Sequence, residues 1–169
     1  MTHYGDLPGA LAYHEARANA AWTAAGVTDT QRTAALVRAS VWLDGEYGAQ
    51  FPGKKTGGRS QQRAWPRTGG TDAEGEELPD DEVPFEVTHS TYEAALRELS
   101  APGSLSPDFV AAERIKQEQV GDLSTTYMDG SGTAADVKPV VNIIDGLLSG
   151  LLAVASSSST SLVGFLARA

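Results

Sequence analysis

The stretch that most constrains this chain is Arg63-Ala64-Trp65-Pro66-Arg67-Thr68-Gly69-Gly70. Proline fixes its own φ and disfavours helical geometry at the residue before it, so Trp65 is driven toward an extended conformation. Gly69 and Gly70 permit a turn with positive φ. The stretch therefore predicts a rigid structural corner, built on Trp65, Pro66 and Gly69, that buries the indole and displays two arginine cations. The helical patterns of the chain lie on either side of it.

Length and charge limit the class of protein. The chain has 169 residues, which suits one domain with a modest core plus extensions. We expect a helical domain over residues 1–155 and a C-terminal extension over 156–169. A formal net charge of -9 argues against a general nucleic-acid coat, which is usually basic. There is no cysteine, so disulfides and thiolate chemistry are excluded, and the N-terminus lacks the pattern of a signal peptide.

Two helices are predicted before the corner. Residues 10–25 are rich in alanine, and Gly26 is typical of the position just past a helix C-terminus. Thr28-Asp29-Thr30 offers N-cap oxygens for a second helix that runs to Asp44 or Tyr47. Its apolar stripe consists of Leu36, Ala39, Leu43 and Tyr47. Trp42 lies beside this stripe, where it could contact Trp65.

Two further helices and a hairpin are predicted after the corner. Pro84 suits the first turn of a helix that ends near Ser100, and Lys138-Pro139 opens the last helix. Two β-prone runs around Gly121-Asp122 predict a hairpin over residues 115–128. A two-stranded hairpin is marginal alone, so we expect it to pair with another strand, such as one from a neighbouring subunit. The fold class is mainly α: a small bundle of about four helices with a β-hairpin, extended loops and a C-terminal tail.

Charge is sorted along the sequence around the corner. A basic loop consists of Lys54, Lys55, Arg59, Arg63 and Arg67, and an acidic segment follows it over residues 72–86. One interpretation is a solvated pair of loops that compensate each other. A second is a DNA-facing loop that neutralises phosphates, with Trp65 as a platform for stacking single-stranded bases. The third is complementary charge that meets across a subunit interface.

No pattern of a catalytic or metal site emerges. Gly48, Gly53 and Lys54 match G-x-x-x-x-G-K, but Lys55 stands where a P-loop needs Ser or Thr, and the stretch follows a predicted helix instead of a strand. The histidines His3, His14 and His89 are widely spaced. We therefore predict no enzymatic activity, no cofactor and no metal.

The C-terminal region is apolar but interrupted. Residues 146–167 carry no charge, yet six consecutive hydroxyl residues from Ser156 to Ser161 make a poor membrane helix. Apolar side chains left in water gain nothing, so docking on a partner explains them better, with self-packing or disorder as alternatives. The predicted partner-binding residues are Leu151, Leu152, Leu162, Val163, Phe165 and Leu166.

Several of these motifs together resemble a known family. They are Trp42-Leu43-Asp44-Gly45-Glu46-Tyr47, the Ala64–Gly69 corner, Leu78-Pro79, Val83-Pro84 and Lys116-x-Glu118-x-Val120-Gly121. In this order they resemble the head–tail connector (adaptor) proteins of tailed phages and gene-transfer agents, many of which are labelled DnaT-like single-stranded DNA-binding protein. The likeness covers about residues 5–152, and the serine tract lies beyond it.

The resemblance implies a structural virion protein. It implies a homo-oligomeric ring, a dodecamer, that sits between the portal and a tail-side connector, stopper or tail terminator protein. Such a ring continues the DNA channel in the virion neck, touches packaged DNA without specificity, and is assembled in the host cytoplasm without a membrane. The alternative hypothesis is a replication-type binder of single-stranded DNA that uses the basic loop and Trp65.

Overall fold

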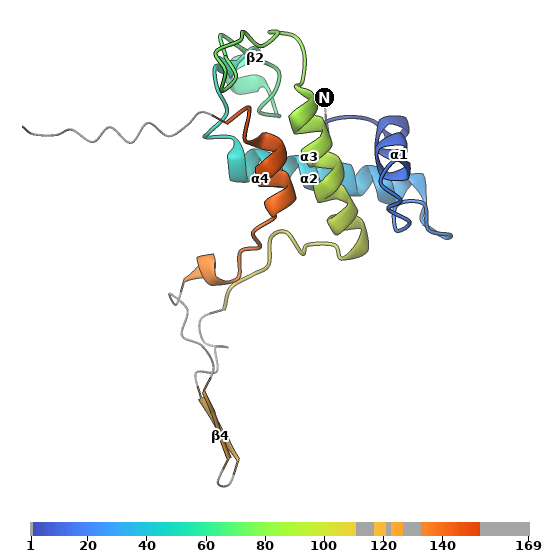
Figure 1. Ribbon diagram of the computed structural model, residues 1–169, viewed down its shortest axis with the longest axis vertical. Coiled ribbons are helices and arrows are strands. Elements are labelled where there is room, and N and C mark those ends of the chain that lie inside the picture. Colours follow the sequence, from blue (N-terminus) through green and yellow to red (C-terminus); the bar gives the residue numbers. More distant parts are fainter. Residues whose placement is uncertain (1, 111–116, 121–122, 127–132, 153–169) are drawn as a thin grey trace, which may run out of the picture.

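The structure is a computed structural model, and it describes residues 2–110, 117–120, 123–126 and 133–152. It confirms a mainly helical fold with a small antiparallel hairpin (Figure 1). The α-helices are α1 (Leu7–Glu15), α2 (Asp29–Tyr47), α3 (Phe85–Ser100) and α4 (Asn142–Leu148). The strands are β1 (Lys54–Lys55), β2 (Arg67–Thr68), β3 (Gln117–Val120) and β4 (Leu123–Thr126), with short 3-10 turns at Gly58–Ser60 and Ala134–Asp136.

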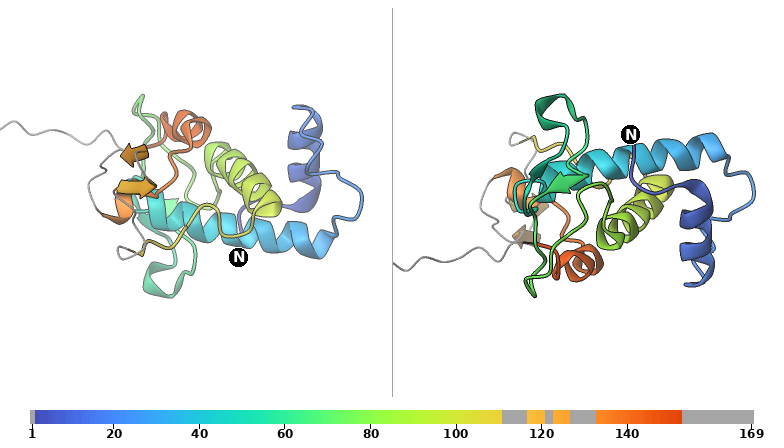
Figure 2. Two further views of the ribbon diagram at one scale, coloured as in Figure 1. Left: turned by 90° about the horizontal axis from the view of Figure 1, so that it is seen from below. Right: turned by 90° about the horizontal axis from the view of Figure 1, so that it is seen from above.

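Helix α2 is the central element of the bundle. Helix α3 packs across it, and α4 and α1 both pack on α3 (Figure 2). The start of α2 is fixed by a capping box, in which Thr28 and Gln31 satisfy each other's backbone N–H groups. The predicted stripe is confirmed, because its four residues are all buried: Leu36, Ala39, Leu43 and Tyr47.

The first helix is shorter than predicted. Asp6 caps α1 by accepting from the Gly9 N–H, and Pro8 lies in its first turn, so Pro8-Gly9 begins the helix instead of preceding it. The helix ends after Glu15, and residues 16–26 form successive turns, one of which places Ala18 at φ 54°. These turns bury Trp22 completely against the ring of His14. Burying an indole outweighs the high helix propensity of the alanines.

The last two helices form as the sequence predicts, with one shift. Helix α3 begins directly after Pro84, while α4 begins at Asn142, a turn later than Lys138-Pro139. The end of α4 is tied to the loop beyond the corner, because the Ala73 N–H donates to the Gly150 carbonyl at 2.8 Å. No helix in the described part of the chain has the length and hydropathy needed to cross a bilayer.

The predicted hairpin is confirmed and is drawn well away from the helices (Figure 1). Strands β3 and β4 pair antiparallel, with Gln119 opposite Ser124 and Val120 opposite Leu123. They contact each other and no other helix or strand within the described ranges. Pairing with a strand of another subunit stays a prediction.

Candidate functional site

The corner after α2 is held by a two-stranded pairing. Lys54 lies opposite Thr68 and Lys55 opposite Arg67. The Trp65–Pro66 peptide is cis, and Gly69 has a φ of 65°. The Trp65 side chain exposes 1% of its surface and packs edge-on against Phe51, with the ring centroids 5.6 Å apart. The corner is thus part of the hydrophobic core.

A polar network locks this corner to α2 and to the N-terminus. The Tyr4 hydroxyl donates to Asp44 Oδ1 at 2.5 Å and accepts from the Trp65 N–H at 3.1 Å. Asp44 Oδ2 accepts from the Ala64 N–H at 3.2 Å and from Arg63 Nη1 at 3.3 Å. Burial raises the pKa of Asp44 although Tyr4 and Arg63 both favour its ionised form, and burial also raises the pKa of Tyr4.

Three of the five basic-loop side chains bind their own chain. The Arg67 guanidinium donates to the carbonyls of residues 51, 52 and 53 at 3.1, 2.6 and 2.7 Å, and desolvation lowers its pKa. Arg63 pairs with Asp44, and Lys55 Nζ donates to the Gln61 carbonyl at 3.2 Å. The two that remain exposed are Lys54 and Arg59.

The DNA-facing interpretation of the basic loop is corrected in part by this geometry. An indole that exposes 1% of its surface offers no face on which a base could stack, so the prediction that Trp65 is a stacking platform is wrong. Arg63 exposes 14% of its side chain and is already ion-paired. Lys54 and Arg59 are left as the members of this loop that are open to a phosphate group.

The acidic segment folds back onto the corner. Asp80 accepts from the Thr68 hydroxyl at 2.8 Å and from the Gly69 N–H at 3.3 Å, and its carbonyl accepts from Thr56. Acidic and basic segments therefore lie side by side within one chain. These contacts are with hydroxyl and amide groups, so compensation of charge between the two segments stays a prediction.

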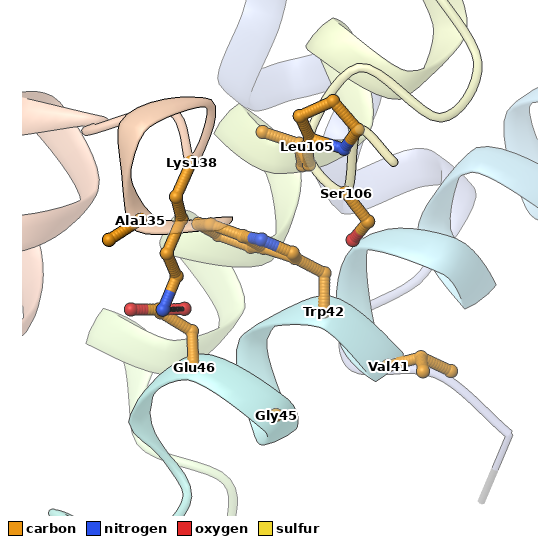
Figure 3. Close-up of a pocket in the computed structure, with 9 residues that line it drawn as sticks. Val41, Trp42, Gly45, Glu46, Leu105, Ser106, Ala135 and Lys138 are labelled. Carbon is orange, nitrogen blue, oxygen red and sulfur yellow. Dashed lines mark ion pairs between the residues drawn. The ribbon is translucent and has the colours of Figure 1, made fainter. Parts of the chain in front are cut away.

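A groove runs along the outer face of α2, with Trp42 at its centre (Figure 3). It has a volume of about 570 Å³, and its walls are residues 105–107 on one side and Ala135 and Lys138 on the other. Lys138 Nζ pairs with Glu46 Oε2 at 2.6 Å at one end. Trp42 points into this groove and meets Tyr47 edge-on, so the predicted contact of Trp42 with Trp65 is wrong.

The predicted partner-binding residues divide into two groups. Leu151 exposes 1% of its surface and Leu152 packs half-buried against the core, so the structure places both inside the chain's own fold. The others lie outside the described residues: Leu162, Val163, Phe165 and Leu166. Of the exposed apolar side chains, Val41 lines the groove and Val140 lines a smaller hollow beside it. Val41 and Trp42 are apolar but lie off the buried stripe of α2. This sequence pattern could have indicated an apolar surface outside the core.

His14 and His89 do not supply a catalytic or metal-binding group to the corner or the groove. His14 is fully buried between the rings of Tyr13 and Trp22, and this burial lowers its pKa. His89 packs among the rings of Tyr13, Phe85 and Tyr92. Within the described ranges, no group of three or more metal-ligating side chains comes together.

These features define a small, mainly helical protein with a projecting hairpin and an apolar groove. The family model described as "Putative DnaT-like ssDNA binding protein" matches residues 3–169, and the chain belongs to this family. No curated protein and no solved structure matches the chain.

Proposed function

We propose that this chain is a structural head–tail adaptor of a phage-like particle, which forms a ring between portal and tail and continues the DNA channel. The observation that carries the proposal is the hairpin, whose strands contact no other described element. An isolated two-stranded hairpin is marginal in water. Its outer edges present backbone N–H and C=O groups, which a strand of the next subunit would satisfy.

The net charge of the chain supports the same proposal. A net charge of -9 suits the wall of a conduit, because the wall repels DNA phosphates and does not hold its cargo. In this proposal the ring is a dodecamer in the virion neck, assembled in the host cytoplasm. The apolar tail residues Leu162–Leu166 bind the portal, and a tail-side connector, stopper or terminator binds the opposite face. The protein has no catalytic role.

The experiment targets the outer edges of the hairpin. In a hairpin with a two-residue turn, the pair next to the turn is hydrogen-bonded, so the N–H groups of the next pair, Gln119 and Ser124, point outward. Gln119→Pro and Ser124→Pro each remove one outward donor, while alanine at the same positions keeps it. The protein is mixed with its cognate portal and observed by electron microscopy.

We expect the alanine variants to add a ring to the portal and at least one proline variant to leave the portal bare. Far-UV circular dichroism checks that the helices of every variant are intact. If both proline variants form rings as well as the parent does, ring contacts do not use the hairpin edges. If the parent protein itself leaves the portal bare, the adaptor proposal fails.

The family description favours a second candidate, binding of single-stranded DNA. In this chain the exposed Lys54 and Arg59 would contact phosphates, without stacking on Trp65. Two phosphate contacts predict that log K falls against log[salt] with a slope of about -1.4. Fluorescence anisotropy with a labelled oligonucleotide tests this, with Lys54→Ala/Arg59→Ala as the variant and Lys138→Ala as the control. Micromolar affinity that the double variant abolishes would establish this candidate, and no binding at low salt would remove it.

A further inference from the structure

We infer that the apolar segment Leu162–Leu166 docks into the groove of its own chain, along Trp42 of α2. This inference concerns the isolated chain and does not depend on ring formation. It identifies an internal binding site that is occupied before any partner is met.

The groove is built to accept an apolar segment. Its floor and one wall are apolar, from Val41, Trp42, Leu105 and Pro107. Its charged groups, Lys138 and Glu46, satisfy each other at one end. Trp22 and Trp65 are 0% and 1% exposed, whereas Trp42 is only partly buried. An apolar hollow around a partly exposed indole marks a surface that a second apolar element covers.

The chain itself supplies a segment of matching chemistry. Residues 153–169 follow the last described residue, and they contain Leu162-Val163-Gly164-Phe165-Leu166. Their one charged side chain is Arg168, so the segment brings no acidic side chain toward Glu46. Bulky apolar side chains lose free energy when they stay in water. The groove and the segment therefore each cover apolar surface that the other leaves exposed.

The reach of the connection favours the chain's own groove over that of a second copy. A smaller hollow of about 210 Å³ shares Trp42 and Lys138 with the groove and extends to Val141, at the start of α4. The seven residues of α4 advance about 10 Å at the helical rise, and a serine-rich connection of about nine residues spans about 17 Å on average, so it is long enough to return to the groove. For a short flexible connection that can span the sites, effective concentration is in the millimolar range. A second copy at micromolar concentration competes poorly with it.

Fluorescence of Trp42 gives a direct test. Acrylamide quenching is measured on the full chain, on residues 1–155, and on two variants that each add one negative charge to the tail, Phe165→Asp and Ala167→Asp. In the Trp42→Phe variant of each protein the remaining fluorescence comes from the two buried indoles, Trp22 and Trp65, and this signal is subtracted. We expect the quenching constant of Trp42 to rise severalfold in residues 1–155 and in Phe165→Asp, and to stay at the full-chain value in Ala167→Asp.

Two further measurements separate the chain's own tail from other occupants. A peptide of residues 160–169, added to residues 1–155, should restore protection of Trp42, and the same peptide with Phe165→Asp should not. Protection in the full chain should be unchanged on hundredfold dilution. Equal quenching in the full chain and in residues 1–155 would overturn the inference. Protection that disappears on dilution would also overturn it, because it would assign the groove to the tail of a second copy.

Discussion

Replacing Asp44 with alanine should remove the lock between the corner and α2. The carboxylate accepts hydrogen bonds from the Tyr4 hydroxyl, the Ala64 N–H and Arg63. Each such bond contributes about 1 kcal/mol net, and a buried donor left without a partner costs about 1 kcal/mol or more. We expect Asp44→Ala to lower the free energy of unfolding by about 3–4 kcal/mol. Urea denaturation followed by circular dichroism measures the change.

Asparagine at the same position separates hydrogen bonding from charge. Burial raises the pKa of Asp44, which means that the site disfavours the ionised carboxylate. Asp44→Asn keeps an acceptor and the side-chain shape, so we expect a loss of only about 1–2 kcal/mol. Asp29→Ala is the surface control, because Asp29 is 77% exposed in its ion pair with Arg32, and it should cost less than about 1 kcal/mol. An Asp44→Ala loss no larger than that of Asp29→Ala would refute the argument.

Three further predictions concern stability measured by the same urea titrations. Arg67→Lys keeps the charge but loses the guanidinium fork to three backbone carbonyls, so it should cost about 2 kcal/mol. Gly53→Ala should lower the free energy of unfolding more than Gly58→Ala does. Both glycines have positive φ, which costs alanine about 1 kcal/mol at either position, but only at Gly53 would the added Cβ also meet a backbone atom, at 2.5 Å. Burial lowers the pKa of His14, so the unfolded chain binds this proton more readily. The free energy of unfolding should therefore have its full value above the unfolded pKa of about 6.5, and it should fall on acidification by up to about 1.4 kcal/mol per pH unit. The His14→Gln variant should show a smaller slope.

Local rules predicted the elements that depend on local interactions. The start of α2 follows from the N-cap oxygen that Thr28 offers, and its buried face follows from the spacing of Leu36 and Leu43. The hairpin follows from two β-prone runs around a turn dipeptide. The alanine-rich region was mispredicted because burial of Trp22 depends on tertiary contacts that helix propensity does not include.

The candidate sites were harder to predict because their partners are distant in sequence. Arg63 and Arg67 count as displayed cations in the sequence, but Asp44 and the carbonyls after α2 bind them once the chain folds back. The groove joins α2 to residues 105–107 and 135–138, which are separated by the hairpin. No spacing rule connects three such segments.

The walls of the groove belong to the two segments of the chain that precede and follow the hairpin. Residues 105–107 precede the hairpin and Ala135 and Lys138 follow it, so both attachments pass alongside Trp42. A displacement of the hairpin that reached these walls would change the gap between them. The emission of Trp42 would then report that displacement.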